Sequence, residues 1–155
     1  MVFFSLGTNL GRRTDNLRRA IRLIRERIGT VVSQSAFIDT KPWGFESSHL
    51  FLNACVGVET SLSPREVLQA TQDIEHEMGR KRKSTDGNYH DRLIDIDILL
   101  YDNLVIDEPD LQIPHPFMAE RMFVMKPLAQ IASKHVVPGT GKSVGEMLKA
   151  LEARS

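Results

Sequence analysis

Apolar residues occur in short runs separated by polar turns, which is the pattern of a mixed α/β chain. The run 2–6 is continuous and stops at Gly7, as expected of a buried strand. Residues 30–38 are rich in β-branched side chains, residues 51–60 alternate apolar with other positions, and the segment 91–102 alternates as well. Each of these segments is therefore predicted to be a strand.

Other segments have apolar residues at helical spacing. One spans 14–28, a second spans 63–78, and two further helices are expected at 119–132 and 143–152. The order strand, helix, strand, strand, helix, strand is the split βαβ pattern. We therefore predict an α+β fold with a ferredoxin-like βαββαβ core. The sheet should be mainly antiparallel with helices on one face, followed by a C-terminal helical extension.

Composition limits the classes of protein that fit. The chain has 155 residues, of which 41% are hydrophobic and 26% charged, so one globular domain over residues 1–155 is expected. Its 20 basic and 20 acidic residues cancel, which argues against general binding to nucleic acid or to an anionic membrane. Cys55 has no second cysteine to pair with, and no long apolar run is present, so we expect a cytoplasmic protein.

The most informative segment is DRLIDIDILLYD at 91–102. In a strand, Asp95 and Asp97 would share one face while the isoleucines between them occupy the other. Two like charges side by side repel each other, which predicts a cation between them. Carboxylates suit Mg²⁺, which one or two of them typically hold together with substrate phosphates. The alternative is an exposed strand face with ordinary solvated aspartates.

A long polar segment, residues 79–92, precedes this strand and carries five basic side chains within 80–92. Such a connection is longer than usual inside a compact domain, and long loops are often lids or binding loops. Basic side chains beside magnesium ligands are the parts that phosphoryl transfer needs, although a solvated loop is the simpler alternative. His115, between two prolines, could donate to a phosphate or could pack structurally.

Aromatic side chains offer surfaces for a flat heterocycle, although aromatic residues more often belong to the core. The candidates are Trp43, Phe45, Phe51 and Phe123. Asn53 has both a donor and an acceptor and could read the edge of such a ring.

With these residues assembled, the chain resembles the 6-hydroxymethyl-7,8-dihydropterin pyrophosphokinases of folate biosynthesis over essentially its full length. The resemblance implies transfer of diphosphate from ATP to the hydroxymethyl oxygen of the pterin, with release of AMP and attack at the β-phosphorus. It also implies that two Mg²⁺ ions assist. The matching segments are SLGTNLG at 5–11, TKPWG at 40–44, FLNACV at 51–56, IEHEMGRKRK at 74–83, DRLIDIDIL at 91–99 and IPHPFMAERMF at 113–123.

The resemblance further implies roles for individual residues. Asp95 and Asp97 match the metal ligands, and the pterin ring would lie between Phe51 and Phe123. The residues implied in catalysis are Arg80, Arg82, Arg92, Asp95 and Asp97. Those implied in ATP binding are Gln72, Glu75, Arg82, Arg92, Ile98, His115 and Arg121. Those implied in pterin binding are Thr40, Pro42, Trp43, Gly44, Phe51, Asn53, Asp95 and Phe123.

Some positions depart from the family pattern. His90 and Asp91 stand where Gly and Pro are common, and Asn88 and Asp110 stand where some members carry Arg, so two ATP contacts would be missing. Phe51 replaces a frequent Tyr.

Two other functions use the same architecture: a nucleotidyltransferase, which would release inorganic pyrophosphate, and a ligand-sensing module. We expect a monomer whose partners are ATP and the pterin, with no nucleic acid or membrane.

Overall fold

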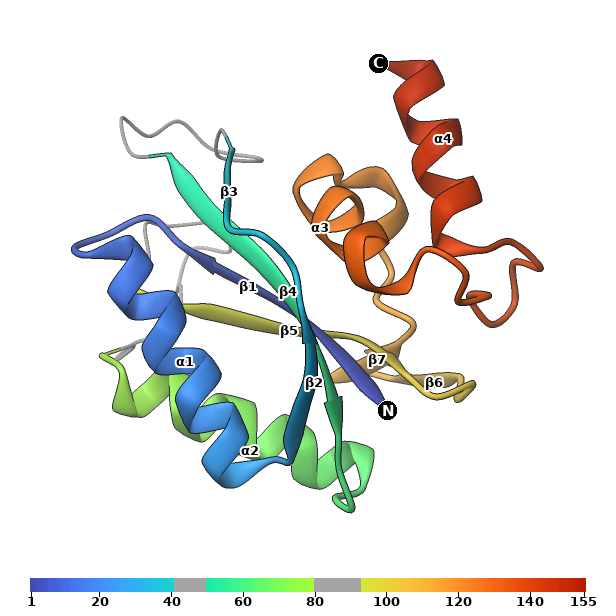
Figure 1. The fold of residues 1–155 in the computed structure, drawn as a ribbon. Coiled ribbons are helices and arrows are strands. Elements are labelled where there is room, and N and C mark those ends of the chain that lie inside the picture. Colours follow the sequence, from blue (N-terminus) through green and yellow to red (C-terminus); the bar gives the residue numbers. More distant parts are fainter. Residues whose placement is uncertain (41–49, 80–92) are drawn as a thin grey trace.

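The protein is described by a computed structural model that covers residues 1–40, 50–79 and 93–155 (Figure 1). Its main sheet is built from β1 (Val2–Thr8), β2 (Thr30–Gln34), β4 (Phe51–Glu59) and β5 (Asp95–Tyr101) in the order β2-β4-β1-β5, and all neighbours are antiparallel. A short strand, β3 (Ile38–Thr40), also pairs with β4. The expected ferredoxin-like α+β fold is confirmed.

Two helices cover one face of this sheet, α1 (Arg13–Arg27) and α2 (Pro64–Glu77) (Figure 1). Their apolar sides pack with alternate residues of the strands in one core. The start of α2 is the one expected from the sequence, because the Ser63 hydroxyl accepts from the Glu66 N–H and the Glu66 carboxylate accepts from the Ser63 N–H. This reciprocal cap satisfies two donors at the helix end.

The segment 30–38, expected to be one strand, is divided between β2 and β3. The interruption is at Ser35, whose hydroxyl accepts from the Cys55 N–H at 2.8 Å and donates to the Ala36 carbonyl at 2.9 Å. A side chain that bonds to neighbouring backbone competes with the regular ladder. The two strands therefore pair with different parts of β4.

The C-terminal extension covers the opposite face of the sheet (Figure 1). A short 3₁₀ turn, η1 (Met118–Glu120), leads into α3 (Met122–Ala132), and α4 (Val144–Arg154) packs against α3. A second core forms there, in which Met125 and Leu128 are fully buried against Phe3 and Cys55. Among the described residues, no helix combines the length and apolar character needed to cross a membrane.

A two-stranded hairpin follows β5, formed by β6 (Ile106–Glu108) and β7 (Leu111–Ile113). This hairpin was not among the elements expected from the sequence. Leu111 and Ile113 are buried in the first core, so β7 is attached to the body of the protein, whereas the turn that joins the two strands is exposed.

Candidate active site

Polar side chains form two rows across three neighbouring strands, on the face that also carries the second core. Gly7 on β1 is opposite Asn53 on β4 and Asp95 on β5, and Ser5 is opposite Cys55 and Asp97. Residues directly opposite each other in a ladder share a face. The next row belongs to Phe3, which is buried under the helical extension. The two rows therefore lie at the end of this face beside the region that the extension covers.

The expected alternation along β5 is confirmed. Ile94, Ile96 and Ile98 are buried in the first core, whereas Asp95 and Asp97 on the opposite face are partly exposed. Both carboxylates thus face the side on which a ligand can reach them.

Asn53 is the centre of a small polar cluster at the outer row. Its side chain is 2% exposed, and its amide nitrogen donates to the Thr40 hydroxyl at 2.5 Å. Gly7 makes room for it, because a Cβ at position 7 would lie 3.0 Å from Asn53 Oδ1 and 3.6 Å from the Phe51 ring. The structure therefore brings together Thr40, Phe51 and Asn53, which the sequence had suggested for pterin binding.

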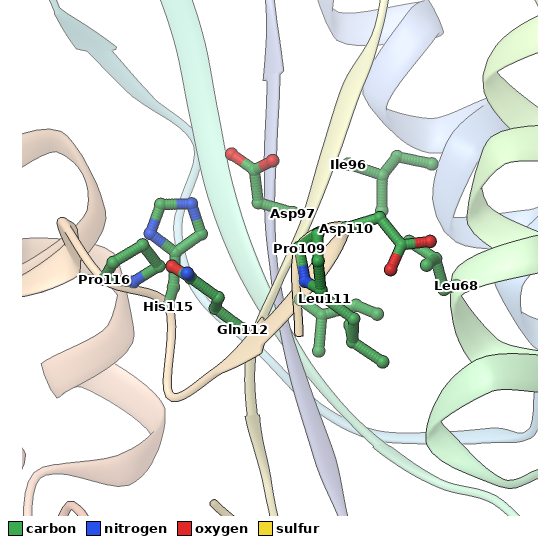
Figure 2. A pocket seen from close by; sticks show the side chains of 10 residues that line it. Leu68, Ile96, Asp97, Pro109, Asp110, Leu111, Gln112, His115 and Pro116 are labelled. Atoms are coloured by element: carbon green, nitrogen blue, oxygen red, sulfur yellow. The ribbon is translucent and has the colours of Figure 1, made fainter. Parts of the chain in front are cut away.

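An open cleft of about 260 Å³ lies along the edge of β5, between α2 and the β6–β7 hairpin (Figure 2). Figure 2 shows the Asp97 carboxylate and the His115 ring on one side of β5, with Leu68 and Asp110 on the other. The residues that line the cleft are Leu68, Ile96, Asp97, Ile98, Pro109, Asp110, Leu111, Gln112, His115 and Pro116. The cleft is therefore lined by both polar and apolar side chains.

His115 is held in a single orientation by its neighbours. Its backbone N–H donates to the Leu99 carbonyl at 2.9 Å, and its Nδ1 accepts from the Phe117 N–H at 3.2 Å. Burial and then the positive charge of Arg121 lower the His115 pKa to about 4, against a smaller opposing effect of Asp95. The ring is consequently neutral at pH 7. Because Nδ1 is an acceptor, Nε2 carries the proton and acts as a donor.

Arg121 lies at the N-terminal end of α3 and is only 6% exposed. Its guanidinium carbon is 5.5 Å from the centre of the Phe117 ring and 5.8 Å from that of Phe123. A cation near two aromatic faces is attracted by both rings. The contacts keep a permanent positive charge beside His115.

Glu75 and Gln72 lie on the stretch of α2 that follows Leu68. Glu75 is 7% exposed, and its carboxylate accepts from the Ile96 N–H at 2.8 Å. Since β5 is the outer strand on this side of the sheet, that contact satisfies a backbone donor that β1 does not engage. Gln72 is exposed to solvent one helical turn after Leu68. The contact made by Glu75 thus stabilises the edge of β5 next to the cleft.

Several residues suggested by the sequence lie outside the described part of the chain. These are Pro42, Trp43, Gly44, Phe45, Arg80, Arg82, Arg92 and the departures Asn88, His90 and Asp91. Conversely, sequence reasoning missed the cleft residues Leu68, Leu111 and Gln112. For Leu68, a usable signal was its position one turn before Gln72.

The donor set near β5 fits a hard divalent cation. Within the described ranges, no group of three or more His, Cys, Asp or Glu side chains could by itself hold a metal ion. Two partly exposed carboxylates, Asp95 and Asp97, are nevertheless what Mg²⁺ uses when substrate oxygens and water complete its shell. The residues present therefore fit magnesium bound jointly with a phosphorylated ligand.

Fold and site define a ferredoxin-like protein with an acidic site at the exposed end of one sheet face. The family model described as 7,8-dihydro-6-hydroxymethylpterin-pyrophosphokinase (HPPK) matches residues 3–133. A 2-amino-4-hydroxy-6-hydroxymethyldihydropteridine pyrophosphokinase of Porphyromonas gingivalis is 47% identical over 133 residues, covering 85% of this chain and 90% of the relative. The Bacillus subtilis protein of that name is 41% identical over 135 residues, covering 86% and 79%. The chain therefore belongs to the HPPK family.

The solved structures agree on the fold. A crystal structure of a Plasmodium falciparum HPPK-DHPS triple mutant superimposes with a TM-score of 0.77 at 16% identity. The match covers 99% of this chain and 44% of the solved one, so the chain spans less than half the length of that protein.

Proposed function

We propose that this protein transfers a diphosphate group from ATP to the hydroxymethyl oxygen of 6-hydroxymethyl-7,8-dihydropterin, with Asp95 and Asp97 at the centre of the reaction. The observation that carries this proposal is the position of the two carboxylates. Asp95 shares a row with Gly7 and Asn53 on one side, while Asp97 lines the cleft with His115 on the other. An acidic pair between two candidate binding regions suits a transfer between two substrates.

The pterin region is assigned to the cluster around Asn53. Its amide and the Thr40 hydroxyl offer donors and acceptors for the ring edge, and Phe51 offers an apolar surface for a ring face. We assign Phe123, Pro42, Trp43 and Gly44 to the same region on the family resemblance. Asp95 lies next to this region in the ladder, close to where the reacting hydroxyl would be.

The nucleotide region is assigned to the cleft. Leu68, Ile98 and Leu111 supply an apolar surface for the base, and the neutral His115 ring donates from Nε2 to a phosphate oxygen. Arg121 adds a fixed positive charge on the same side. We also assign Gln72 and Glu75 to the α2 side of this region. Arg80, Arg82 and Arg92 are assigned to the phosphates on the family resemblance.

The reaction is a displacement at phosphorus. The pterin oxygen forms a bond to the β-phosphorus of ATP, the bond between that phosphorus and the α–β bridging oxygen breaks, and AMP leaves while the hydroxyl proton is lost. Two magnesium ions, when bound at Asp95 and Asp97, would neutralise phosphate charge and polarise the hydroxyl. The side chains of the protein hold both substrates in line for the displacement, and the arginines assigned to the phosphates offset the negative charge of ATP.

Replacement of Asp97 tests the proposal. Asp97→Ala should abolish turnover without unfolding the protein, because removing one of two neighbouring like charges leaves the isoleucine face of β5 intact. Asp15→Ala, at an exposed carboxylate in the first turn of α1, serves as the matched control. The assay should follow release of AMP together with the pterin diphosphate. Wild-type turnover by the Asp97 variant, or release of inorganic pyrophosphate from ATP by the native protein, would contradict the proposal.

We further propose that residues 1–155 act as one domain, as a monomer, in the cytoplasm. Cys55 has no second cysteine in the sequence with which to form a disulfide, which is usual for proteins of a reducing compartment. Gel filtration over a range of protein concentrations would test the monomer, and a mass that increases with concentration would contradict it.

A further inference from the structure

One guanidinium joins the two walls of the cleft. Leu68 on α2 lines one wall, and Pro109 and Asp110 at the tip of the β6–β7 hairpin line the other (Figure 2). Arg65 is one helical turn before Leu68, and its Nη1 donates to Asp110 Oδ2 at 2.8 Å. Its Nη2 donates to the carboxylate of Glu108. Both bonds connect α2 to the hairpin at the same end of the cleft.

The hairpin has few other means of holding its tip in place. Each of its strands has three residues; β7 carries the buried side chains Leu111 and Ile113, and on β6 Ile106 is partly buried against the same core. Isolated two-stranded hairpins are marginally stable in water. The tip, where Asp110 is exposed, therefore depends on contacts made by its own side chains.

Arginine is suited to this position. Its planar guanidinium can donate to two carboxylates at once in a fixed geometry. The ammonium of lysine is a single point charge on a flexible chain and fixes its partners less well. The hydrogen bond from Arg65 also lowers the Asp110 pKa, as expected for a carboxylate beside a guanidinium. Asp110, a departure from the family pattern, thus has a definite partner in this chain.

We propose that Arg65 is a positioning residue that fixes the hairpin wall against α2 and thereby sets the affinity of the cleft for the nucleotide. Arg65 does not touch the reacting atoms. It acts through Asp110 and Glu108, which it holds at a fixed distance from Leu68. The inference rests on the proposed function, because it takes the cleft as the ATP site.

The test compares Arg65→Ala with Arg27→Ala. Arg27 is the matched control because it forms a similar exposed ion pair with Glu77, at the opposite end of α2 and away from the cleft. Binding of a nonhydrolysable ATP analogue with Mg²⁺ is measured by calorimetry, and steady-state kinetics are measured for both substrates. Arg65→Ala should raise the Kd of the analogue and the KM for ATP by about 3- to 5-fold, the upper end of what an exposed ion pair contributes. The KM for the pterin and kcat should remain within about twofold of the wild-type values.

Two further variants separate positioning from a loss of folding. Arg65→Lys should restore part of the affinity, and the double variant Glu108→Gln with Asp110→Asn should reproduce the effect with Arg65 in place. The inference is overturned if Arg65→Ala behaves like Arg27→Ala, or if both KM values rise together as the melting temperature falls. If the wild-type protein does not bind the analogue at all, the proposed function fails and the inference fails with it.

Discussion

His115 illustrates how immediate surroundings decide the chemistry of a residue. Partial burial and the charge of Arg121 both favour the neutral ring, and the Phe117 N–H fixes which nitrogen accepts. A neutral donor is useful beside phosphates because it bonds to an oxygen without titrating near pH 7.

This shift predicts a pH dependence of stability. The folded protein keeps His115 neutral down to pH about 4, whereas the unfolded chain takes up a proton below the ordinary value of 6.5. Stability is therefore unaffected by this group above pH 6.5 and is lost as the pH falls from 6.5 toward 4. At pH 5 the loss should be on the order of 1–2 kcal/mol, with allowance for partial exposure.

Urea denaturation at pH 7.5 and pH 5 would measure this loss, and His115→Gln should remove it. NMR titration of the His115 ring gives the pKa directly. A measured pKa above 6 would contradict the prediction.

Gly7 leaves room for the Asn53 side chain because it has no side chain of its own. Gly7→Ala would bring a Cβ to within 3.0 Å of Asn53 Oδ1, closer than most such contacts, so the amide must move. The backbone at position 7 does not require glycine for its conformation, since it is an ordinary strand residue. We expect the KM for the pterin to rise by about tenfold and the KM for ATP to stay unchanged. Equal changes in both would show that the variant disturbs the sheet rather than the Asn53 cluster.

At the scale of elements, the strand β3 is tied to the protein from two directions. It pairs with β4 at the Asn53 cluster, and on the opposite face of the sheet Arg13 donates to Asp39 at 2.6 Å. The same nitrogen donates to the Leu50 carbonyl at 2.9 Å, just before β4 begins. Arg13 thus holds β3 and the start of β4 together beside the pterin region.

Removal of this tie should weaken pterin binding selectively. Arg13→Ala should raise the KM for the pterin by about 3- to 10-fold and cost only about 0.2–1 kcal/mol of stability, as is usual for a partly exposed ion pair. Arg18→Ala, at an exposed position on the same helix, is the control. An unchanged pterin KM in the Arg13 variant, measured by steady-state kinetics, would contradict the role.

The elements predicted best are those in which local chemistry and burial agree. The capping box at Ser63 begins α2 at the expected residue, and the alternation along β5 reports its two faces. The break at Ser35 was not predictable, because it depends on a bond to Cys55, a residue distant in sequence. The β6–β7 hairpin was missed for a similar reason, since its stability comes from Leu111 and Ile113 packing into a core made by other elements.

At the scale of the molecule, one sheet serves two cores. Consecutive residues of β1 point in opposite directions, so Phe3 packs under α3 and Phe4 packs under α1 and α2. The sequence predicted helices on one face of the sheet and did not place the C-terminal helices. The spacing of apolar residues shows which side of a helix is apolar, but not which face of the sheet that side packs against.

The candidate site, too, could be predicted from the sequence only in part. Asp95 and Asp97 could be recognised from one segment, because strand geometry alone puts them on one face. The cleft could not, because its walls come from α2, β5 and the β6–β7 hairpin, which only the folded chain brings together. Resemblance to the family implied roles for single residues, whereas the bonds between Arg65 and the hairpin form only when folding brings α2 and the hairpin together.

The shared sheet predicts that the two cores unfold together. Leu17 in the first core and Leu128 in the second are both fully buried, so Leu17→Ala and Leu128→Ala should each cost about 2–5 kcal/mol. Because β1 and β4 contribute to both cores, loss of either core removes support for the other, and one cooperative transition is expected. Far-UV circular dichroism should therefore coincide with the NMR signal of His135, whose ring packs edge-on to Phe3 at 5.6 Å. Separate midpoints for the two probes, in particular early loss of the His135 signal in Leu128→Ala alone, would show that the helical extension unfolds as an independent unit.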